Sequence, residues 1–83
     1  MFFVYAIYNT NNQKIYIGQT EDCEKRLVAH NNKTFKCSYT SRFDGKWELI
    51  YKEAVCTRQD ALKRERQLKS FRGREFVKQY IPL

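Results

Sequence analysis

Apolar residues gather in short stretches that polar turns separate. Residues 2–8 and 14–20 are rich in β-branched and aromatic side chains, which favours strands. The Asn-rich stretch 9–13 between them is typical of a turn. The pattern therefore predicts a β-hairpin, and residues 47–55 predict a third strand.

Two helices are expected between and after these strands. Thr20 can cap a first helix that runs to about Asn31 or Asn32, with acidic residues in its first turn. Residues 31–45 show no sustained period and predict a loop or a short helix. Thr57, followed at the third position by Asp60, resembles a capping box. It opens the clearest helix of the chain.

That helix is expected to run from Arg58 to about Ser70. Gly73 is expected to interrupt it before a last helical turn through Tyr80, and Pro82 ends the turn. The order β-β-α-(α)-β-α-(α) predicts an α+β fold, with a small three-stranded antiparallel sheet flanked by helices. No linker or repeat divides residues 1–83, so a single domain is expected.

Composition indicates a class of partner for this fold only through charge. Of the 83 residues, 42% are hydrophobic, which supports a folded domain. The net charge is +7, and residues 57–83 hold eight Lys or Arg against three Asp or Glu. Such a field favours polyanions and nucleic acid above all. The alternative is a basic surface that serves solubility alone.

The cysteines point to a reducing compartment. Cys23, Cys37 and Cys56 are odd in number and lack paired spacing, so a disulfide framework is not expected and the cytoplasm is the predicted location. With His30 they could supply four zinc ligands, but the close ligand pairs of structural zinc sites are missing. The apolar N-terminus lacks a basic region before it and predicts a strand, not a signal peptide.

Two tyrosines of the hairpin are candidates for chemistry. If the loop 9–13 joins the strands directly, Tyr8 lies opposite Lys14 and Tyr16 lies opposite Ala6. This assumed register places Tyr8 and Tyr16 on one face with Ala6 and Gly18, while Phe3, Tyr5, Ile7, Ile15 and Ile17 form the other face. The alternative is that both tyrosines are half-buried aromatics with no chemical role.

Each predicted helix carries a charged residue on its core-facing stripe. In the first helix, Arg26 and His30 share the stripe with Cys23 and Leu27. In the helix capped by Thr57, Glu65 is the one carboxylate on the corresponding stripe. An inward carboxylate is expected to be paired or bound to a metal. Glu65 and Arg26 could also form a structural ion pair.

The ordered set of motifs resembles a known family. Ala6-Ile7-Tyr8 followed by Tyr16-Ile17-Gly18 is similar to the two half-motifs of the GIY-YIG endonuclease superfamily, with Ala in place of the first Gly. Further similar pieces are Arg26-Leu27 with His30-Asn31, the segment 39–42, and Glu65 within 61–65. The resemblance covers nearly the whole chain and is closest to small standalone members.

This resemblance implies a divalent-metal-dependent endonuclease that hydrolyses phosphodiester bonds, with DNA as the expected substrate, in repair, recombination or a mobile element. It implies that Glu65 binds Mg²⁺ or Mn²⁺ and that Arg26 holds the phosphate. Tyr8 and Tyr16 are expected to position the attacking water, one of them as general base, and His30 is a second candidate for moving the proton. Two departures from the family pattern predict a weak activity or a special substrate: no Asn follows Glu65, where some larger members have one, and Gln19 follows Gly18, where many members have a cation.

Nucleic acid is expected to contact a set of mostly basic residues without reading the bases: Gly18, Arg42, Lys63, Arg66, Lys69, Arg72 and Arg74. Tyr39, Phe43 and Trp47 are candidates for stacking on exposed bases. A monomer or weak homodimer is expected. The alternative function is a non-catalytic basic nucleic-acid-binding module on the same fold.

Overall fold

The computed structural model describes residues 2–31 and 45–82. In chain order, the described elements are β1 (Phe2–Asn9), β2 (Lys14–Thr20), α1 (Cys23–Asn31), β3 (Trp47–Val55), α2 (Arg58–Lys69) and α3 (Phe71–Lys78). They form the predicted α+β fold with its three-stranded antiparallel sheet. The short helix considered for residues 31–45 falls mainly on residues 32–44, which lie outside the described residues.

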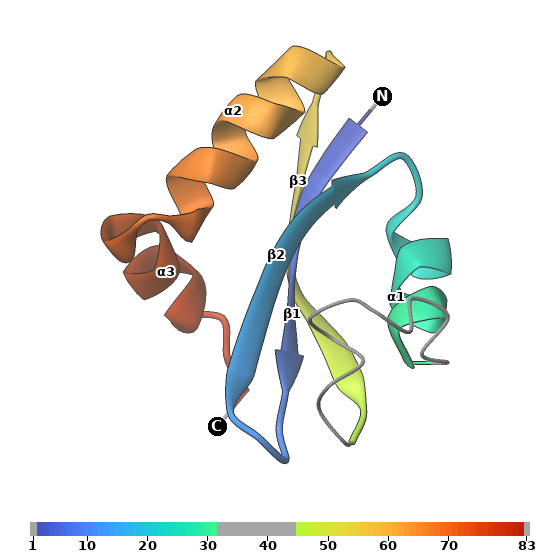
Figure 1. Cartoon of the computed structure of the whole chain (residues 1–83), viewed down its shortest axis with the longest axis vertical. Helices are drawn as coiled ribbons and strands as arrows, with labels where there is room; N and C mark the ends of the chain where they lie inside the picture. The colour runs from blue at the N-terminus through green and yellow to red at the C-terminus, as the bar shows by residue number, and fades with distance from the viewer. Residues whose placement is uncertain (1, 32–44, 83) are drawn as a thin grey trace.

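The sheet has the order β2-β1-β3, so β1 lies in the centre and pairs antiparallel with both neighbours. Figure 1 shows α2 and α3 on one side of the sheet and α1 on the other. The described part of the chain therefore has three layers, and β2 forms one edge of the middle layer.

Each face of the sheet has its own hydrophobic cluster because side chains alternate along the central strand. Val4 and Ala6 of β1 pack with the buried residues of α2 and α3. Tyr5 and Ile7 of the same strand pack with Cys23 of α1 and with Trp47. The single strand β1 thus supplies side chains to both cores.

The hairpin register differs from the predicted one by a single residue. Asn9 pairs with Lys14, and Tyr5 lies opposite Gly18. The cause is the Asn9 side chain, whose Oδ1 accepts a hydrogen bond from the backbone N–H of Asn12 at 3.0 Å and so begins the turn one residue later. Gln13 completes the turn with a φ of 54°. A shift of one residue moves every side chain to the other face relative to its partner strand.

The helix ends also differ in detail from the prediction. Asp22, not Thr20, caps α1, because its Oδ1 accepts from the backbone N–H of Lys25 at 3.1 Å. Thr57 caps α2 as predicted, accepting from the N–H of Asp60 at 3.1 Å. The break before α3 falls at Ser70 and not at Gly73. The Ser70 hydroxyl oxygen accepts from the N–H of Gly73 at 3.2 Å and so begins α3.

Candidate active site

A polar pocket of about 450 Å³ lies at the outer edge of β2. Three of the predicted catalytic residues line it: Tyr16 from β2, Arg26 from α1 and Glu65 from α2. Gln19, Thr20, Glu21 and Arg58 add further polar side chains to its wall. Since α1 and α2 cover opposite faces of the sheet, their side chains can meet only around its rim, and here they meet at the edge formed by β2.

The tyrosine beside Tyr16 is Tyr5, so the prediction that Tyr8 and Tyr16 share a face is wrong. Tyr8 lies opposite Ile15, which packs into the cluster beneath α2 and α3. Tyr5 and Tyr16 both belong to the cluster beneath α1, with ring centroids 6.3 Å apart. The one-residue change of register is the physical reason for this correction. Recognising Asn9 as the start of the turn would have identified Tyr5 from the sequence.

Gly18 is required by the close approach of these two rings. A Cβ atom built there would lie 2.9 Å from the Tyr5 hydroxyl oxygen and 3.0 Å from Cε2 of Tyr16. The small residue therefore leaves room for the two phenols themselves. It keeps the Tyr5 hydroxyl at the level of the sheet edge.

His30 joins the two tyrosines from α1. Its Nε2 lies 2.9 Å from the Tyr5 hydroxyl oxygen, and its ring centroid lies 5.0 Å from that of Tyr16. Burial, with a smaller effect of the Arg26 charge, lowers the pKa of His30 to about 4. A neutral imidazole at physiological pH leaves one ring nitrogen able to accept the Tyr5 proton.

Burial raises the pKa of Tyr5 well above its ordinary value, and Arg26 opposes this rise through its hydrogen bond to the phenol and its positive charge. Tyr5 is therefore protonated at neutral pH. Its hydroxyl lies between a guanidinium that favours the phenolate and an imidazole that can take the proton.

Glu65 extends from α2 into the pocket with 18% of its side chain exposed. Its Oε1 lies 3.4 Å from the Nζ of Lys69, one turn further along the helix. Within residues 2–31 and 45–82, no three His, Cys, Asp or Glu side chains gather as a metal cluster. Glu65 and Glu21 are the two carboxylates that line the pocket, and one or two carboxylates fit a magnesium-type site, where water and substrate phosphate supply the other oxygen ligands.

The family profile described as the GIY-YIG catalytic domain matches residues 1–79. The chain belongs to the GIY-YIG family. A UPF0213 protein of Staphylococcus epidermidis is 33% identical to this GIY-YIG domain over 76 residues, covering 92% of the chain and 89% of that protein. A UPF0213 protein of Staphylococcus saprophyticus is 36% identical over 64 residues, covering 77% of the chain and 76% of that protein.

Among solved structures, the solution NMR structure of a UPF0213 protein from Bacillus halodurans is similar to this GIY-YIG domain. The TM-score is 0.53 with 25% sequence identity, and the match covers 93% of this chain and 82% of that one. Family membership makes the chain a nucleic-acid endonuclease domain by class. No helix in the described part of the chain is long and apolar enough to cross a membrane.

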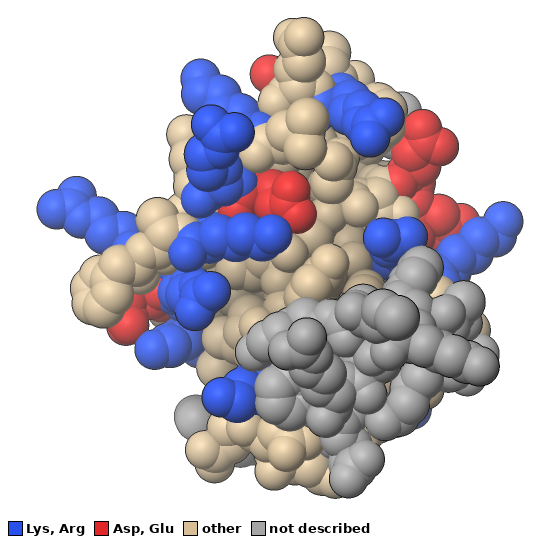
Figure 2. Space-filling view, in the orientation of Figure 1, with Lys and Arg blue, Asp and Glu red and all other residues tan. Residues whose placement is uncertain are grey.

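The predicted nucleic-acid contacts of this GIY-YIG domain lie in different places. Lys69 and Arg74 line a hollow beside β2, Arg66 lies near Lys69 on the outside of α2, and Arg72 lines a separate hollow. Lys63 is exposed on α2. Figure 2 shows Lys and Arg gathered over the side of the molecule formed by α2 and α3.

Three of the other predicted contacts, Arg42, Tyr39 and Phe43, lie outside the described residues. Trp47 is 1% exposed, so the prediction that its ring stacks on bases is wrong. It is instead part of the core beneath α1. The Asn31 side chain fixes the Trp47 backbone by accepting from its N–H at 2.6 Å and donating to its carbonyl at 3.1 Å.

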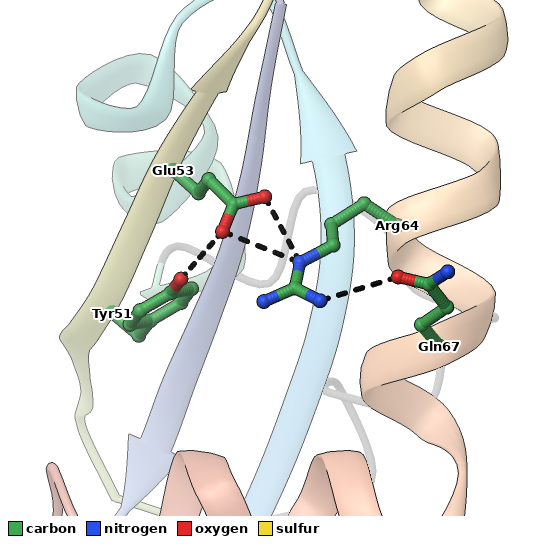
Figure 3. A network of polar contacts seen from close by, with 4 residues as sticks. All are labelled: Tyr51, Glu53, Arg64 and Gln67. Atoms are coloured by element: carbon green, nitrogen blue, oxygen red, sulfur yellow. Dashed lines mark hydrogen bonds and ion pairs between the residues drawn. The ribbon is translucent and has the colours of Figure 1, made fainter.

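A second polar network, which the sequence did not indicate, fixes α2 on the sheet of the GIY-YIG domain (Figure 3). The Glu53 carboxylate of β3 accepts from the Tyr51 hydroxyl at 2.7 Å and from Arg64 Nε at 2.9 Å. Arg64 also donates to Gln67 Oε1 at 3.2 Å. Because neighbouring helix residues point about 100° apart, holding Arg64 toward β3 leaves Glu65 turned toward β2 and the pocket.

Proposed function

We propose that this GIY-YIG domain is a divalent-metal-dependent endonuclease that hydrolyses phosphodiester bonds in DNA, in repair, recombination or a mobile element. One observation carries the proposal: Tyr16, Arg26 and Glu65 converge on one pocket, with the hydrogen-bonded pair of Tyr5 and His30 beside it. A polar pocket that combines two arginines with two carboxylates suits a metal-bound phosphate diester better than an apolar substrate.

Two arginines bind the phosphate in this proposal. Arg26 and Arg58 approach the pocket from α1 and from the start of α2. A guanidinium offers parallel N–H donors to phosphoryl oxygens and stabilises the negative charge that develops in the transition state. Glu65 would hold Mg²⁺ or Mn²⁺, which when bound neutralises the scissile phosphate and stabilises the leaving oxygen.

The pair of Tyr5 and His30 moves the proton of the attacking water. As the water loses a proton to the Tyr5 oxygen, the phenol passes its own proton to His30 Nε2, 2.9 Å away. This relay agrees with the raised pKa of Tyr5, because the phenol gains one proton as it loses another and need not ionise. Tyr16 lines the pocket and orients the water. Tyr8, on the other face, takes no part.

Cleavage of supercoiled plasmid and of single-stranded and branched oligonucleotides tests the proposal, with Mg²⁺ or Mn²⁺ and with chelator. Wild type is expected to cut only with metal, and Glu65→Gln is expected to remove cleavage while retaining binding. Glu75→Gln is the matched control, because Glu75 is an exposed acid of α3 that pairs with Lys78.

Full activity of the Glu65→Gln protein would disprove the metal assignment. Binding without cleavage of every substrate by wild type would instead support the non-catalytic binding module. We also propose a cytoplasmic location, because the odd number and unpaired spacing of the cysteines are typical of a reducing compartment. A monomer or weak homodimer is proposed as the oligomeric state.

A further inference from the structure

Three hollows follow one another along the outer edge of β2. The active-site pocket shares Tyr16 with a hollow of about 280 Å³. That second hollow shares Ile15 and Arg74 with a third of about 230 Å³ beside the hairpin turn. Because neighbours share lining residues, the second and third hollows form one groove that leads away from the pocket. We call it the β2 groove.

The β2 groove is basic. Lys69 and Arg74 line its first part, and Lys14, Arg74 and Lys78 line its second part. No carboxylate lines either part among the described residues. Lys69 stands at the junction, since it also contacts Glu65 of the active-site pocket at 3.4 Å. A polyanion bound in the pocket would therefore meet further positive charge along the groove.

The side of the β2 groove formed by the strand is mainly apolar. It consists of Ile15, Tyr16 and Ile17. Among the described residues, β2 pairs only with β1, so the backbone N–H and C=O groups of its outer edge face the groove. Apolar and aromatic surface beside cations suits a single strand, whose bases expose faces and edges, whereas a duplex offers mainly its phosphates.

We infer that the β2 groove holds a single strand of nucleic acid that continues from the cleaved phosphate toward the hairpin turn. The inference rests on the proposed function, because it names the form of the substrate at that site. The part of β2 that lines the groove, residues 14–17, extends over about 10 Å at a rise of roughly 3.3 Å per residue, the length of about three stacked nucleotides.

The test measures binding and not cleavage. A Glu65→Gln background in chelator prevents cutting, and fluorescence anisotropy follows a labelled 12-nucleotide single strand and the same sequence as a blunt duplex over a salt series. The groove variant is Lys14→Gln with Arg74→Gln. The charge-matched control is Lys46→Gln with Lys52→Gln. Lys52 lies on β3, the strand at the opposite edge of the sheet, and Lys46 is the residue directly before that strand.

The single strand is expected to bind more tightly than the duplex. The groove variant should flatten the slope of log affinity against log salt by about 1.4, roughly 0.7 for each lost phosphate contact, while the control keeps the wild-type slope. Lys14→Arg with Arg74→Lys keeps both charges and should bind as the background does. The affinity of this charge-conserving variant and the thermal melt of every variant together show whether weaker binding comes from lost phosphate contacts or from an unfolded protein.

Equal flattening by the control pair would overturn the inference, as would tighter binding of the duplex with the same dependence on Lys14 and Arg74. Either result can occur while wild type still cuts with metal, which would leave the proposed function standing. If the wild-type protein does not cut any substrate but binds the single strand through the groove, the inference about the groove is supported and the proposed function is contradicted.

Discussion

Acidification should destabilise this fold through His30. The imidazole is 2% exposed, and burial followed by the Arg26 charge lowers its pKa to about 4. Between the ordinary value of 6.5 and about 4, the unfolded chain binds a proton that the native protein does not, so stability falls as the pH falls. At 1.36 kcal/mol per pH unit, the difference of about 2.5 corresponds to a loss of about 3 kcal/mol.

Urea unfolding of wild type and of the His30→Gln variant from pH 7.5 to pH 4 measures this loss. The Gln amide can accept the Tyr5 hydrogen bond near the position of Nε2 but does not titrate. Carboxylates common to both proteins cancel in the difference between the two unfolding free energies. That difference should change by about 3 kcal/mol in favour of the variant as the pH falls. A difference that stays constant would show that His30 does not resist protonation.

Three further substitutions probe the site and the fold. Tyr5→Phe should lower the rate of plasmid nicking by roughly 10²–10⁴-fold, whereas Tyr8→Phe should cut like wild type. Tyr5→Phe should also lower the free energy of unfolding by about 1–3 kcal/mol, because it leaves the buried His30 nitrogen without its hydrogen-bond partner. Equal rates of nicking by the two variants would refute the relay. Gly18→Ala should slow nicking at least tenfold, because its Cβ would lie 2.9 Å from the Tyr5 hydroxyl oxygen, and an unchanged rate would show that the phenol need not stay there. Gly73→Ala should lower stability in urea by roughly 1–3 kcal/mol, because its Cβ would collide with backbone atoms of Leu68; a neutral result would mean that α3 shifts freely against α2.

Local patterns were sufficient to predict the elements of this fold. The composition of residues 2–8, 14–20 and 47–55 identified all three described strands, the last two with both ends correct. The helix that begins at Arg58 followed from the Thr57 cap, which acts within one turn. These signals depend on residues close in sequence, so they can be recognised without knowledge of the tertiary structure.

The register of the hairpin could not be predicted in the same way. The stretch 9–13 holds three Asn residues, and each can begin a turn by accepting a backbone hydrogen bond. The choice of Asn9 depends on the burial of its side chain, which is a tertiary property. That choice exchanges Tyr8 for Tyr5 beside Tyr16 and so changes which phenol belongs to the site.

The helix stripes located the charged part of the site more reliably. Arg26 and Glu65 both line the pocket, because a helix with one buried stripe leaves little freedom in where its charged residues point. Their convergence at the β2 edge, and the network of Arg64 with Glu53, depend on how the layers are stacked. No spacing within the sequence indicates either feature.

The division of the site between two outer layers makes catalytic competence an all-or-none property of the domain. Arg26 and His30 belong to the layer of α1, and Glu65 belongs to the layer of α2, with the central strand as the shared partner of both cores. Any local unfolding that separates α1 or α2 from the sheet would therefore disrupt the site. A substrate that contacts both layers therefore stabilises the folded domain. At a concentration of a hundred times its dissociation constant, it would add about 2.7 kcal/mol to the free energy of unfolding. Partly unfolded forms of the domain are therefore expected to lack the proposed site and to be inert.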